Sequence, residues 1–261
     1  MASTRPESRE AYQHQHDPEK IAARLESGPE SVYLKDFVYG AIDGAVTTFA
    51  VVAGVAGAGL APGIIIILGF ANLLADGFSM AVSNFLGTRA ESQYRDQARR
   101  RELDEVHKWP EGEREEVKQI YARKGFEGEL LEQVVNVLTS DKDRWVDVML
   151  QEEHGMSLTD HHAGRAGLAT FAAFLLVGLI PLLPYLLNWT GLVSWTGATQ
   201  IAAPFLWSAI MTSVAFFWVG ALKGRFVNQS WLLSGGETLG IGGAAAAMAY
   251  GVGVLLKDLV G

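Results

Sequence analysis

Five long apolar runs constrain what this chain can fold into. They cover Phe37–Leu60, Pro62–Gly87, Ala166–Leu187, Ile201–Leu222 and Leu239–Leu256. Each run is near or above the roughly 20 residues that a helix needs to cross the hydrocarbon core of a bilayer. None of the five has the Lys- and Glu-rich face that a helix at the surface of a soluble protein would show. The runs therefore predict an all-α, polytopic membrane protein with five transmembrane helices.

The distribution of basic residues predicts the orientation of these helices. Of the 21 Lys and Arg residues, five precede the first run and thirteen lie in residues 89–165. Lys223 and Arg225 follow the fourth run, and only Lys257 lies beyond the fifth. Because basic residues stay on the cytoplasmic side, the N-terminus, the central segment and the loop Lys223–Glu237 are expected in the cytoplasm. The C-terminus then lies on the far side of the membrane.

Composition excludes several classes of function. The first 30 residues are polar and contain no apolar core before a cleavage site, so no cleavable signal is expected. The absence of cysteine excludes disulfides, thiolate zinc sites and iron–sulfur clusters. A net charge of −8 argues against nucleic acid as a partner. The sequence has no Gly-rich phosphate loop, so we expect neither an ATP-driven pump nor an organic cofactor.

A polar stripe runs along the second apolar segment. Asn72, Asp76, Met80 and Asn84 recur every four positions and would share one face of a helix. A carboxylate in lipid persists where it faces a partner, a cavity or an ion. A carboxylate together with a thioether suits Fe²⁺ better than Mg²⁺ or Ca²⁺. The alternatives are that Met80 fills the core and that the asparagines form hydrogen bonds between helices.

Asp43 lies about two helical turns inside the first apolar run and is a second candidate for an ion pathway. The alternative is a neutral carboxyl group that binds a neighbouring helix. Further along the same run, Gly54, Gly57 and Gly59 predict that this helix packs closely against another. Their spacing fits a second copy of the chain and a helix of the same chain equally well.

The segment between the second and third runs is acidic, with 18 Asp and Glu residues against 11 Lys and Arg residues from Glu91 to Asp160. Its pattern predicts that the second helix continues through Arg99 to Val106 and stops at Trp109-Pro110. Further helices are expected over Glu111–Arg123, Glu129–Leu138 and Lys142–Glu153. Helices this short have little core of their own, so we expect them to pack on each other or on a second subunit.

Acidic residues in this segment occur in pairs that suggest a metal site. Two pairs are spaced i, i+3 on the helices before and after Pro110, and a break at Pro110 would allow them to face each other. A methionine and a glutamate, spaced i, i+4, follow on the last helix. The alternative is a solvated charged face, because Glu129 and Glu132 have the same spacing. The candidate ligands for several divalent ions are Glu102, Glu105, Glu113, Glu116, Met149 and Glu153.

Three motifs together resemble the vacuolar iron transporter family. They are Gly40-Ala-Ile-Asp43-Gly44, then Gly69-Phe-Ala-Asn-Leu-Leu-Ala-Asp-Gly-Phe-Ser-Met80-Ala, and Arg89-Ala-Glu91 at the end of the second run. The resemblance extends over residues 33–258 and includes Trp145-Val-Asp-Val-Met149 and the Gly- and Ala-rich fifth run. The combination is specific, whereas each motif alone is not.

The resemblance implies a homodimer with five helices per subunit that exchanges Fe²⁺ for protons and moves iron out of the cytoplasm, for storage or detoxification. It implies that Asp43 and Met80 are pathway ligands and that the acidic insert is a cytoplasmic metal-binding domain with the six ligands named above. Mn²⁺, Zn²⁺ and Co²⁺ are further candidate substrates. One departure is Leu150, where relatives often carry a second methionine; His154 is also unusual, and it is a candidate to compensate.

The resulting division of the chain has four parts. Residues 1–32 are expected to form a mobile cytoplasmic N-terminus, 33–90 the ion pathway, 91–162 the cytoplasmic metal-binding domain, and 163–261 the last three transmembrane helices. A bacterial inner membrane is the expected location, with a vacuolar membrane as the alternative.

Two other functions compete with an antiporter. A passive divalent-metal channel would need the same residues without proton movement. A carboxylate di-iron oxidase is disfavoured, because Glu102 and Glu113 are each followed by Glu at i+3 and not by His. The protein is therefore expected not to be an enzyme.

Overall fold

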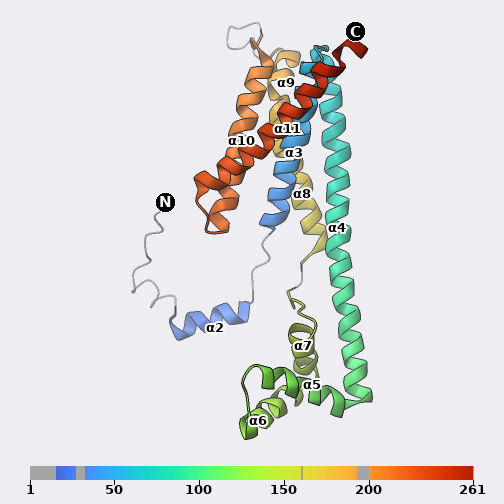
Figure 1. The fold of residues 1–261 in the computed structure, drawn as a ribbon, viewed down its shortest axis with the longest axis vertical. Coiled ribbons are helices and arrows are strands. Elements are labelled where there is room, and N and C mark those ends of the chain that lie inside the picture. The colour runs from blue at the N-terminus through green and yellow to red at the C-terminus, as the bar shows by residue number, and fades with distance from the viewer. Residues whose placement is uncertain (1–15, 28–32, 160, 193–199, 261) are drawn as a thin grey trace. The chain divides into compact units, whose positions relative to one another are not determined.

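The computed structural model describes residues 16–27, 33–159, 161–192 and 200–260, which are almost entirely helical (Figure 1). No strand occurs among these residues. The chain divides into two compact units, one of residues 1–85 and 164–261 and the other of residues 86–163. The prediction of an all-α polytopic protein is confirmed.

Five helices of the described part are long and apolar enough to cross a membrane, as predicted. They are α3 (Leu34–Gly57), α4 (Pro62–Lys108), the segment Ala163–Thr190, α10 (Pro204–Phe226) and α11 (Trp231–Val260). The segment Ala163–Thr190 contains α8 (Ala163–Gly178), a 3₁₀ turn η1 (Ile180–Leu182) and α9 (Leu183–Thr190). Pro181 therefore tightens one turn of the third span without ending it, because a proline early in a helical turn costs no hydrogen bond.

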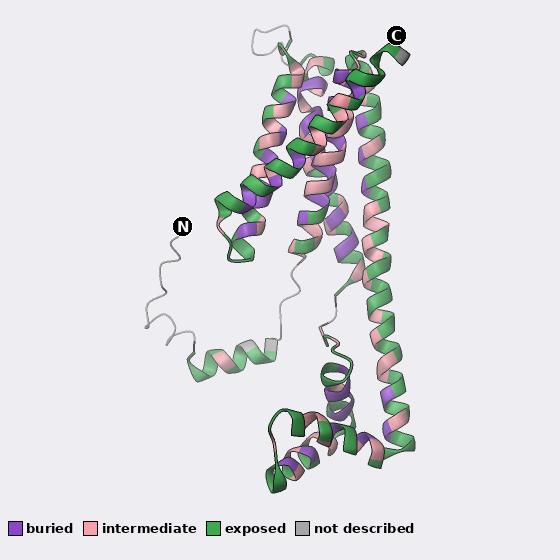
Figure 2. Ribbon diagram, viewed as in Figure 1, coloured by how far each residue is buried: buried purple, intermediate pink, exposed green. Residues whose placement is uncertain are grey.

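The core of the first unit lies where α3, α4 and the third span meet. Phe49 and Val52 of α3 pack with Leu73 of α4, with Phe174 of α8 and with Leu182 of η1. Figure 2 shows the buried positions that recur along α3, whose apolar and small residues face several neighbours at once. Helix α3 is thus the central helix of this unit.

Glycines on α3 allow close approaches to two neighbouring helices. A Cβ at Gly40 would lie 2.2 Å from the carbonyl oxygen of Thr170, and one at Gly44 would lie 2.4 Å from that of Phe174, both on α8. Near the other end, a Cβ at Gly57 would lie 2.4 Å from the carbonyl oxygen of Tyr250 on α11. Small residues on α3 therefore allow close packing against other helices of the same chain, one of the two partners that their spacing predicted.

Helix α11 begins earlier than the apolar pattern predicts. The predicted fifth run starts at Leu239, but the helix starts at Trp231, and the connection from α10 is limited to residues 227–230. The predicted loop Lys223–Glu237 was therefore too long. Its small residues pack closely: a Cβ at Gly220 of α10 would lie 2.5 Å from the carbonyl oxygen of Ser234. Close packing against α10 keeps this stretch helical although its hydropathy is low.

The second unit contains the end of α4 and three short helices, α5 (Pro110–Arg123), α6 (Gly128–Thr139) and α7 (Lys142–Glu152). Helix α4 ends at Lys108, and Pro110 begins α5, so the break at Trp109-Pro110 was predicted correctly. These helices share a core of their own, which includes Val117, Val135 and Val146. The expectation that they pack on each other is confirmed, although their core is larger than their lengths suggest.

The N-terminal segment 1–32, predicted to be mobile, contains one described helix, α2 (Pro18–Ser27). Residues 1–15 and 28–32 of that prediction lie outside the described part of the chain.

Candidate functional site

Two glutamates in the second unit have buried side chains in which one carboxyl oxygen has no hydrogen-bond partner. The side chain of Glu102 on α4 is 2% exposed and that of Glu113 on α5 is 6% exposed. The Oε2 atom of each is buried without a hydrogen-bond partner. Neither forms an ion pair with Lys or Arg among the described residues. Burying a carboxylate in this state destabilises a fold unless a cation compensates for it.

Further carboxylates surround these two. One carboxylate oxygen from each of Glu102, Glu105 and Glu113 lies within 4.8 Å of the others. Burial raises the pKa of Glu113 to about 7, and the charges of Glu116, Glu102, Glu105 and Glu153 add to the effect. Burial and the same kind of repulsion also raise the pKa of Glu153. We call these five glutamates, 102, 105, 113, 116 and 153, the acidic cluster.

The acidic cluster contains all five glutamates predicted as ligands, and the turn at Pro110 brings the pairs of α4 and α5 together. Mutual repulsion of this kind is relieved when a divalent cation binds, so the arrangement suits metal binding. Glu105 also accepts an ion pair from Arg101, with Nε 3.0 Å from Oε1. The part of the cluster without a Lys or Arg partner is therefore centred on Glu102 and Glu113.

Met149, the sixth predicted ligand, lies in a different environment. Its side chain is fully buried in the apolar core of the second unit, beside Val146 and Leu150. The thioether therefore contributes to packing in this structure. Leu150 is 1% exposed and packs in the same core.

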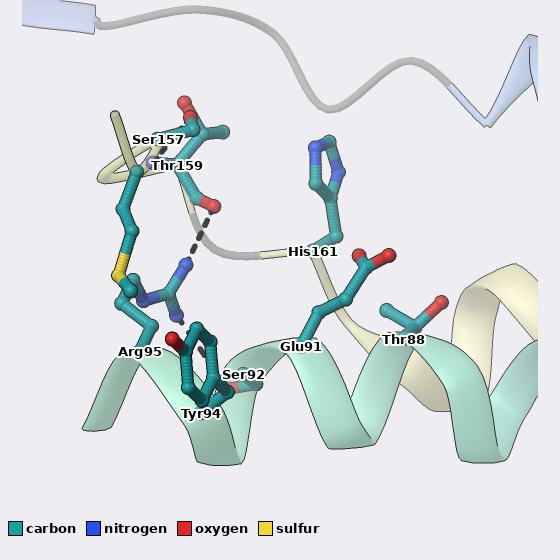
Figure 3. A pocket seen from close by; sticks show the side chains of 9 residues that line it. Thr88, Glu91, Ser92, Tyr94, Arg95, Ser157, Thr159 and His161 are labelled. Atoms are coloured by element: carbon teal, nitrogen blue, oxygen red, sulfur yellow. Dashed lines mark hydrogen bonds between the residues drawn. The ribbon is translucent and has the colours of Figure 1, made fainter. Parts of the chain in front are cut away.

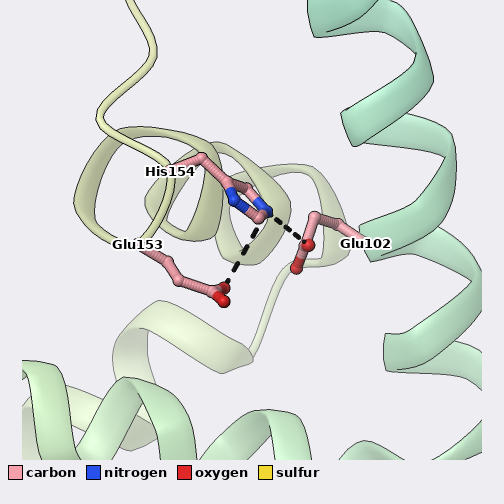
Figure 4. A group of neighbouring side chains, drawn as sticks. All are labelled: Glu102, Glu153 and His154. Atoms are coloured by element: carbon pink, nitrogen blue, oxygen red, sulfur yellow. Dashed lines mark hydrogen bonds and ion pairs between the residues drawn. The ribbon is translucent and has the colours of Figure 1, made fainter.

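His154 adds a nitrogen atom to the acidic cluster. It follows α7, and its Nε2 lies 2.8 Å from Oε1 of Glu102 and 3.9 Å from Oε2 of Glu153 (Figure 4). Glu102, Glu153 and His154 form a second group whose ligand atoms lie within 4.8 Å of one another. The hydrogen bond to Glu102 raises the pKa of His154. The resemblance made His154 a candidate to compensate for Leu150, but its contact with Glu102 was not predicted, because no spacing rule connects a residue beyond α7 to α4.

A separate cavity of about 240 Å³ lies in the second unit between α4 and the segment after α7 (Figure 3). Arg95 points into it and donates to the carbonyl oxygen of Thr159 at 2.8 Å and toward Oγ of Ser92 at 3.5 Å. Glu91 is the one carboxylate among its described lining residues, and His161 the one imidazole. The cavity lining therefore does not contain a group of several carboxylates like that of the acidic cluster.

Two carboxylates of the first unit lie close together within the spanning helices. Asp43 on α3 is half-buried and lies near enough to Asp76 on α4 for their charges to interact. Asp76 itself is exposed on the surface of the single chain. The two predicted pathway acids thus come from different helices, and the charge of one acts on the other.

The two asparagines of the polar stripe bind neighbouring helices. The Nδ2 of Asn72 donates to Oγ1 of Thr47 at 3.1 Å and to Oγ1 of Thr48 at 3.3 Å. The Nδ2 of Asn84 donates to Oδ1 of Asp36 at 2.8 Å and to Oγ1 of Thr170 at 2.7 Å. These contacts match the alternative of hydrogen bonds between helices. Met80 is half-buried and packs against the core of the first unit.

Comparison with known proteins identifies the family. The model of the VIT family matches residues 34–254. A vacuolar iron transporter of Toxoplasma gondii is 34% identical over 238 residues, which cover 88% of this chain and 76% of that protein. Vacuolar iron transporter 1 of Arabidopsis thaliana is 32% identical and covers 83% of both chains. Vacuolar iron transporter 1 of Oryza sativa is 30% identical, covering 93% of this chain and 90% of that protein.

These three relatives are named as transporters and not as enzymes, which agrees with the prediction that the chain is not an enzyme. The resemblance inferred from three short motifs therefore extends over most of the chain. With five helices able to span a membrane and a family match over residues 34–254, this chain belongs to the VIT family.

Proposed function

We propose that the protein is a proton-coupled antiporter that moves Fe²⁺ out of the cytoplasm, for iron storage or detoxification. Its family membership and the names of its relatives support iron as the substrate. Mn²⁺, Zn²⁺ and Co²⁺ are included as further substrates, because carboxylates and a thioether accept several borderline divalent ions.

The electrostatic interaction between Asp43 on α3 and Asp76 on α4, two carboxylates of the spanning helices, carries the proposal. Two carboxylates in an apolar medium repel each other and are stabilised either by protons or by a divalent cation. Binding of Fe²⁺ and binding of protons are therefore mutually exclusive at this pair. Competition of this kind couples the movement of iron in one direction to the movement of protons in the other.

A homodimer completes the proposal. On α4, Asp76 is exposed in the single chain, and so are Ser79 and Ser83 on the following turns. A carboxylate that faced lipid would be costly, whereas one that faces a second subunit or a hydrated path is not. We therefore assign this side of α4 to the contact between two copies, with the ion pathway (residues 33–90) between them and residues 163–261 around it.

The acidic cluster is proposed to collect Fe²⁺ in the cytoplasm before transport. Residues 91–162 act as the metal-binding domain, with Glu102, Glu105, Glu113, Glu116 and Glu153 as ligands, and Met149 as a ligand only after its side chain moves. In this topology the N-terminus and the domain are cytoplasmic and the C-terminus is on the far side. The membrane is a bacterial inner membrane, with the vacuole as the alternative that the relatives' names favour.

Metal uptake into proteoliposomes with an enclosed pH dye tests the coupling. Fe²⁺ entry should alkalinise the interior, because protons leave as iron enters, and an imposed pH gradient should change its rate. The Asp43→Asn variant should lose both signals while it remains folded. Glu237→Gln is a matched control, because it removes one exposed carboxylate from α11. Coupled flux at the wild-type rate through Asp43→Asn would refute the assignment, and iron entry without proton movement would favour a passive channel.

Met80 provides a second test of the pathway. Leucine preserves its volume and apolar character, so packing alone predicts little change in stability or flux. A ligand role predicts a selective loss of Fe²⁺ flux in a folded protein. Unchanged flux through Met80→Leu would assign this side chain to the core in which it packs.

A further inference from the structure

The contact between Glu102 and His154 joins two elements that are far apart in the sequence. Glu102 projects from α4, and His154 lies beyond the end of α7, 52 residues later (Figure 4). Oε1 of Glu102 lies at hydrogen-bond distance, 2.8 Å, from Nε2 of His154, and Oε2 is buried without a hydrogen-bond partner. A buried carboxylate with one unpaired oxygen, beside a ring nitrogen, presents donor atoms of the kind that bind a metal ion.

The backbone fixes the position of this imidazole. The N–H of His154 donates to the carbonyl oxygen of Met149 at 3.2 Å, which continues the last turn of α7. Gly155 follows with φ +64°, a left-handed conformation that ends the helix. Because Met149 is fully buried, the residue that anchors His154 is itself held by the core of the second unit.

The spacing of the donor atoms matches a single ion. Nε2 of His154 lies 2.8 Å from Oε1 of Glu102 and 3.9 Å from Oε2 of Glu153. Metal–nitrogen and metal–oxygen bonds of about 2.0–2.2 Å place neighbouring ligand atoms about 3–3.5 Å apart. The two separations of 2.8 and 3.9 Å lie on either side of this range.

We propose that His154 is a nitrogen ligand in the acidic cluster and makes it selective for transition metals over Mg²⁺ and Ca²⁺. Imidazole binds iron, cobalt, nickel and zinc well, whereas Mg²⁺ and Ca²⁺ prefer oxygen donors alone. The proposal rests on the metal-binding role of residues 91–162 and adds a residue that determines specificity. In its absence the cluster would be an all-oxygen site, open to the abundant hard cations.

Full-length protein in detergent, without a histidine tag, allows the test. Co²⁺ serves as the probe, measured by calorimetric titration with and without competing Mg²⁺. X-ray absorption at the cobalt edge then distinguishes imidazole, whose ring scatters in a characteristic way, from carboxylate. The variants are His154→Leu, which removes both nitrogens, and His154→Gln, which keeps a hydrogen-bond donor for Glu102. His107→Leu is the matched control, because His107 is exposed on α4 in the same unit.

The expected result is imidazole scattering in the wild type and in His107→Leu, and its loss in both His154 variants. Co²⁺ affinity in those two variants should fall by about tenfold or more, while Mg²⁺ affinity stays constant, so that Mg²⁺ competes more effectively. An oxygen-only spectrum in the wild type, or full Co²⁺ affinity in His154→Gln, would overturn the proposal. Failure of the wild type to bind any Co²⁺ outside the membrane pathway would instead refute the metal-binding domain itself.

Discussion

Two glutamate pairs with the same i, i+3 spacing have opposite environments in the second unit. Glu102 and Glu105 on α4 belong to the acidic cluster, where Glu102 is 2% exposed and has no Lys or Arg partner among the described residues. Glu132, which has this spacing to Glu129 on α6, is partly exposed and forms ion pairs with two basic side chains. It accepts from Arg114 at 3.1 Å and also from Lys118, and these contacts lower the pKa of Glu132.

The comparison shows that the supply of counter-ions distinguishes a candidate metal site from a solvated acidic face. Glu132 obtains its positive charges from the neighbouring helix α5. Glu102 has a guanidinium one turn away on its own helix, but Arg99 binds Asp143 at 2.8 Å and also Asp147, both on α7. The fold thus withholds Lys and Arg side chains from Glu102 and provides them to Glu132.

The largest expected effect is the loss of metal binding when the acidic cluster is neutralised, compared with neutralising Glu129 and Glu132. Replacing Glu102, Glu105, Glu113 and Glu116 together by glutamine should weaken Fe²⁺ binding outside the membrane by at least ~100-fold, because every charged ligand except Glu153 is lost. Replacing Glu129 and Glu132 should leave binding unchanged. Anaerobic calorimetry on full-length protein measures both. Equal losses in the two variants would mean that only net charge matters.

Flux measurements on the same variants distinguish a role in metal binding from a role in the transport pathway. The quadruple variant should transport Fe²⁺ at a reduced but measurable rate, because Asp43 and Met80 remain. Complete loss of flux from a folded quadruple variant would mean that the acidic cluster is part of the pathway itself.

The pH dependence of binding should be the next largest effect. Since the pKa of Glu113 is about 7, this carboxyl group is protonated in mildly acidic solution and a metal must displace its proton. Affinity should therefore fall as the pH decreases below 7, by up to about tenfold per pH unit. Titrations between pH 5.5 and 8 test this, and in Glu113→Gln the slope near pH 7 should become shallower. A wild-type affinity that is constant over this range would contradict the raised pKa.

The stability of the metal-free protein should change in opposite directions when Glu113 and Glu132 are each replaced by glutamine. The pKa of Glu113 is raised by folding, so its contribution to the free energy of unfolding decreases as the pH rises from about 4.5 to about 7. Glu113→Gln should then stabilise the metal-free protein above pH 7 by about 1–3 kcal/mol, and not at pH 4. Glu132→Gln should destabilise it slightly at neutral pH, because it loses its ion pairs. Thermal unfolding with a chelator present provides the measurement.

The smallest expected effect concerns the basic residue that is kept away from the cluster. Replacing Asp143 and Asp147 by asparagine releases Arg99, whose guanidinium can then approach Glu102 at i, i+3 and compete with a cation. Fe²⁺ affinity should decrease by a few-fold, roughly the strength of a partly exposed ion pair. Adding Arg99→Gln to this double variant should restore it. A decrease that persists in the triple variant would indicate that the ion pairs act only by holding α7 on α4.

Local signals predicted most of the secondary structure. Pro110 fixed the end of α4, and the apolar runs located the five spans to within a few residues, apart from the start of α11. Hydropathy placed residues 231–238 in a loop because it does not register helix contacts made through small residues such as Gly220 and Ser234. The i, i+3 pairs and the break at Pro110 were sufficient to bring Glu102 and Glu113 together in the prediction.

The remaining features depend on contacts between distant parts of the chain. Nothing in the sequence near His154 indicates that its ring reaches Glu102, 52 residues earlier. The partners of Asn72 on α3 and of Asn84 on α3 and α8 were equally inaccessible to periodicity, which gives the face of a helix but not its neighbour. Met149 illustrates the converse: its i, i+4 spacing with Glu153 suggested a ligand, while the core of the second unit has buried it.

The glycines of α3 have a consequence for how a transport cycle can proceed. Gly40 and Gly44 hold one end of this helix against the backbone of α8, and Gly57 holds the other end against α11. Rotating α3 about its axis would turn neighbouring side chains, which are larger, into spaces that do not accept even a methyl group. Asp43 is thus carried by a helix that is packed closely against two neighbours. In the proposed transport cycle, opening the pathway alternately to the two sides of the membrane would then come from displacement of α4, or of whole subunits, past Asp43.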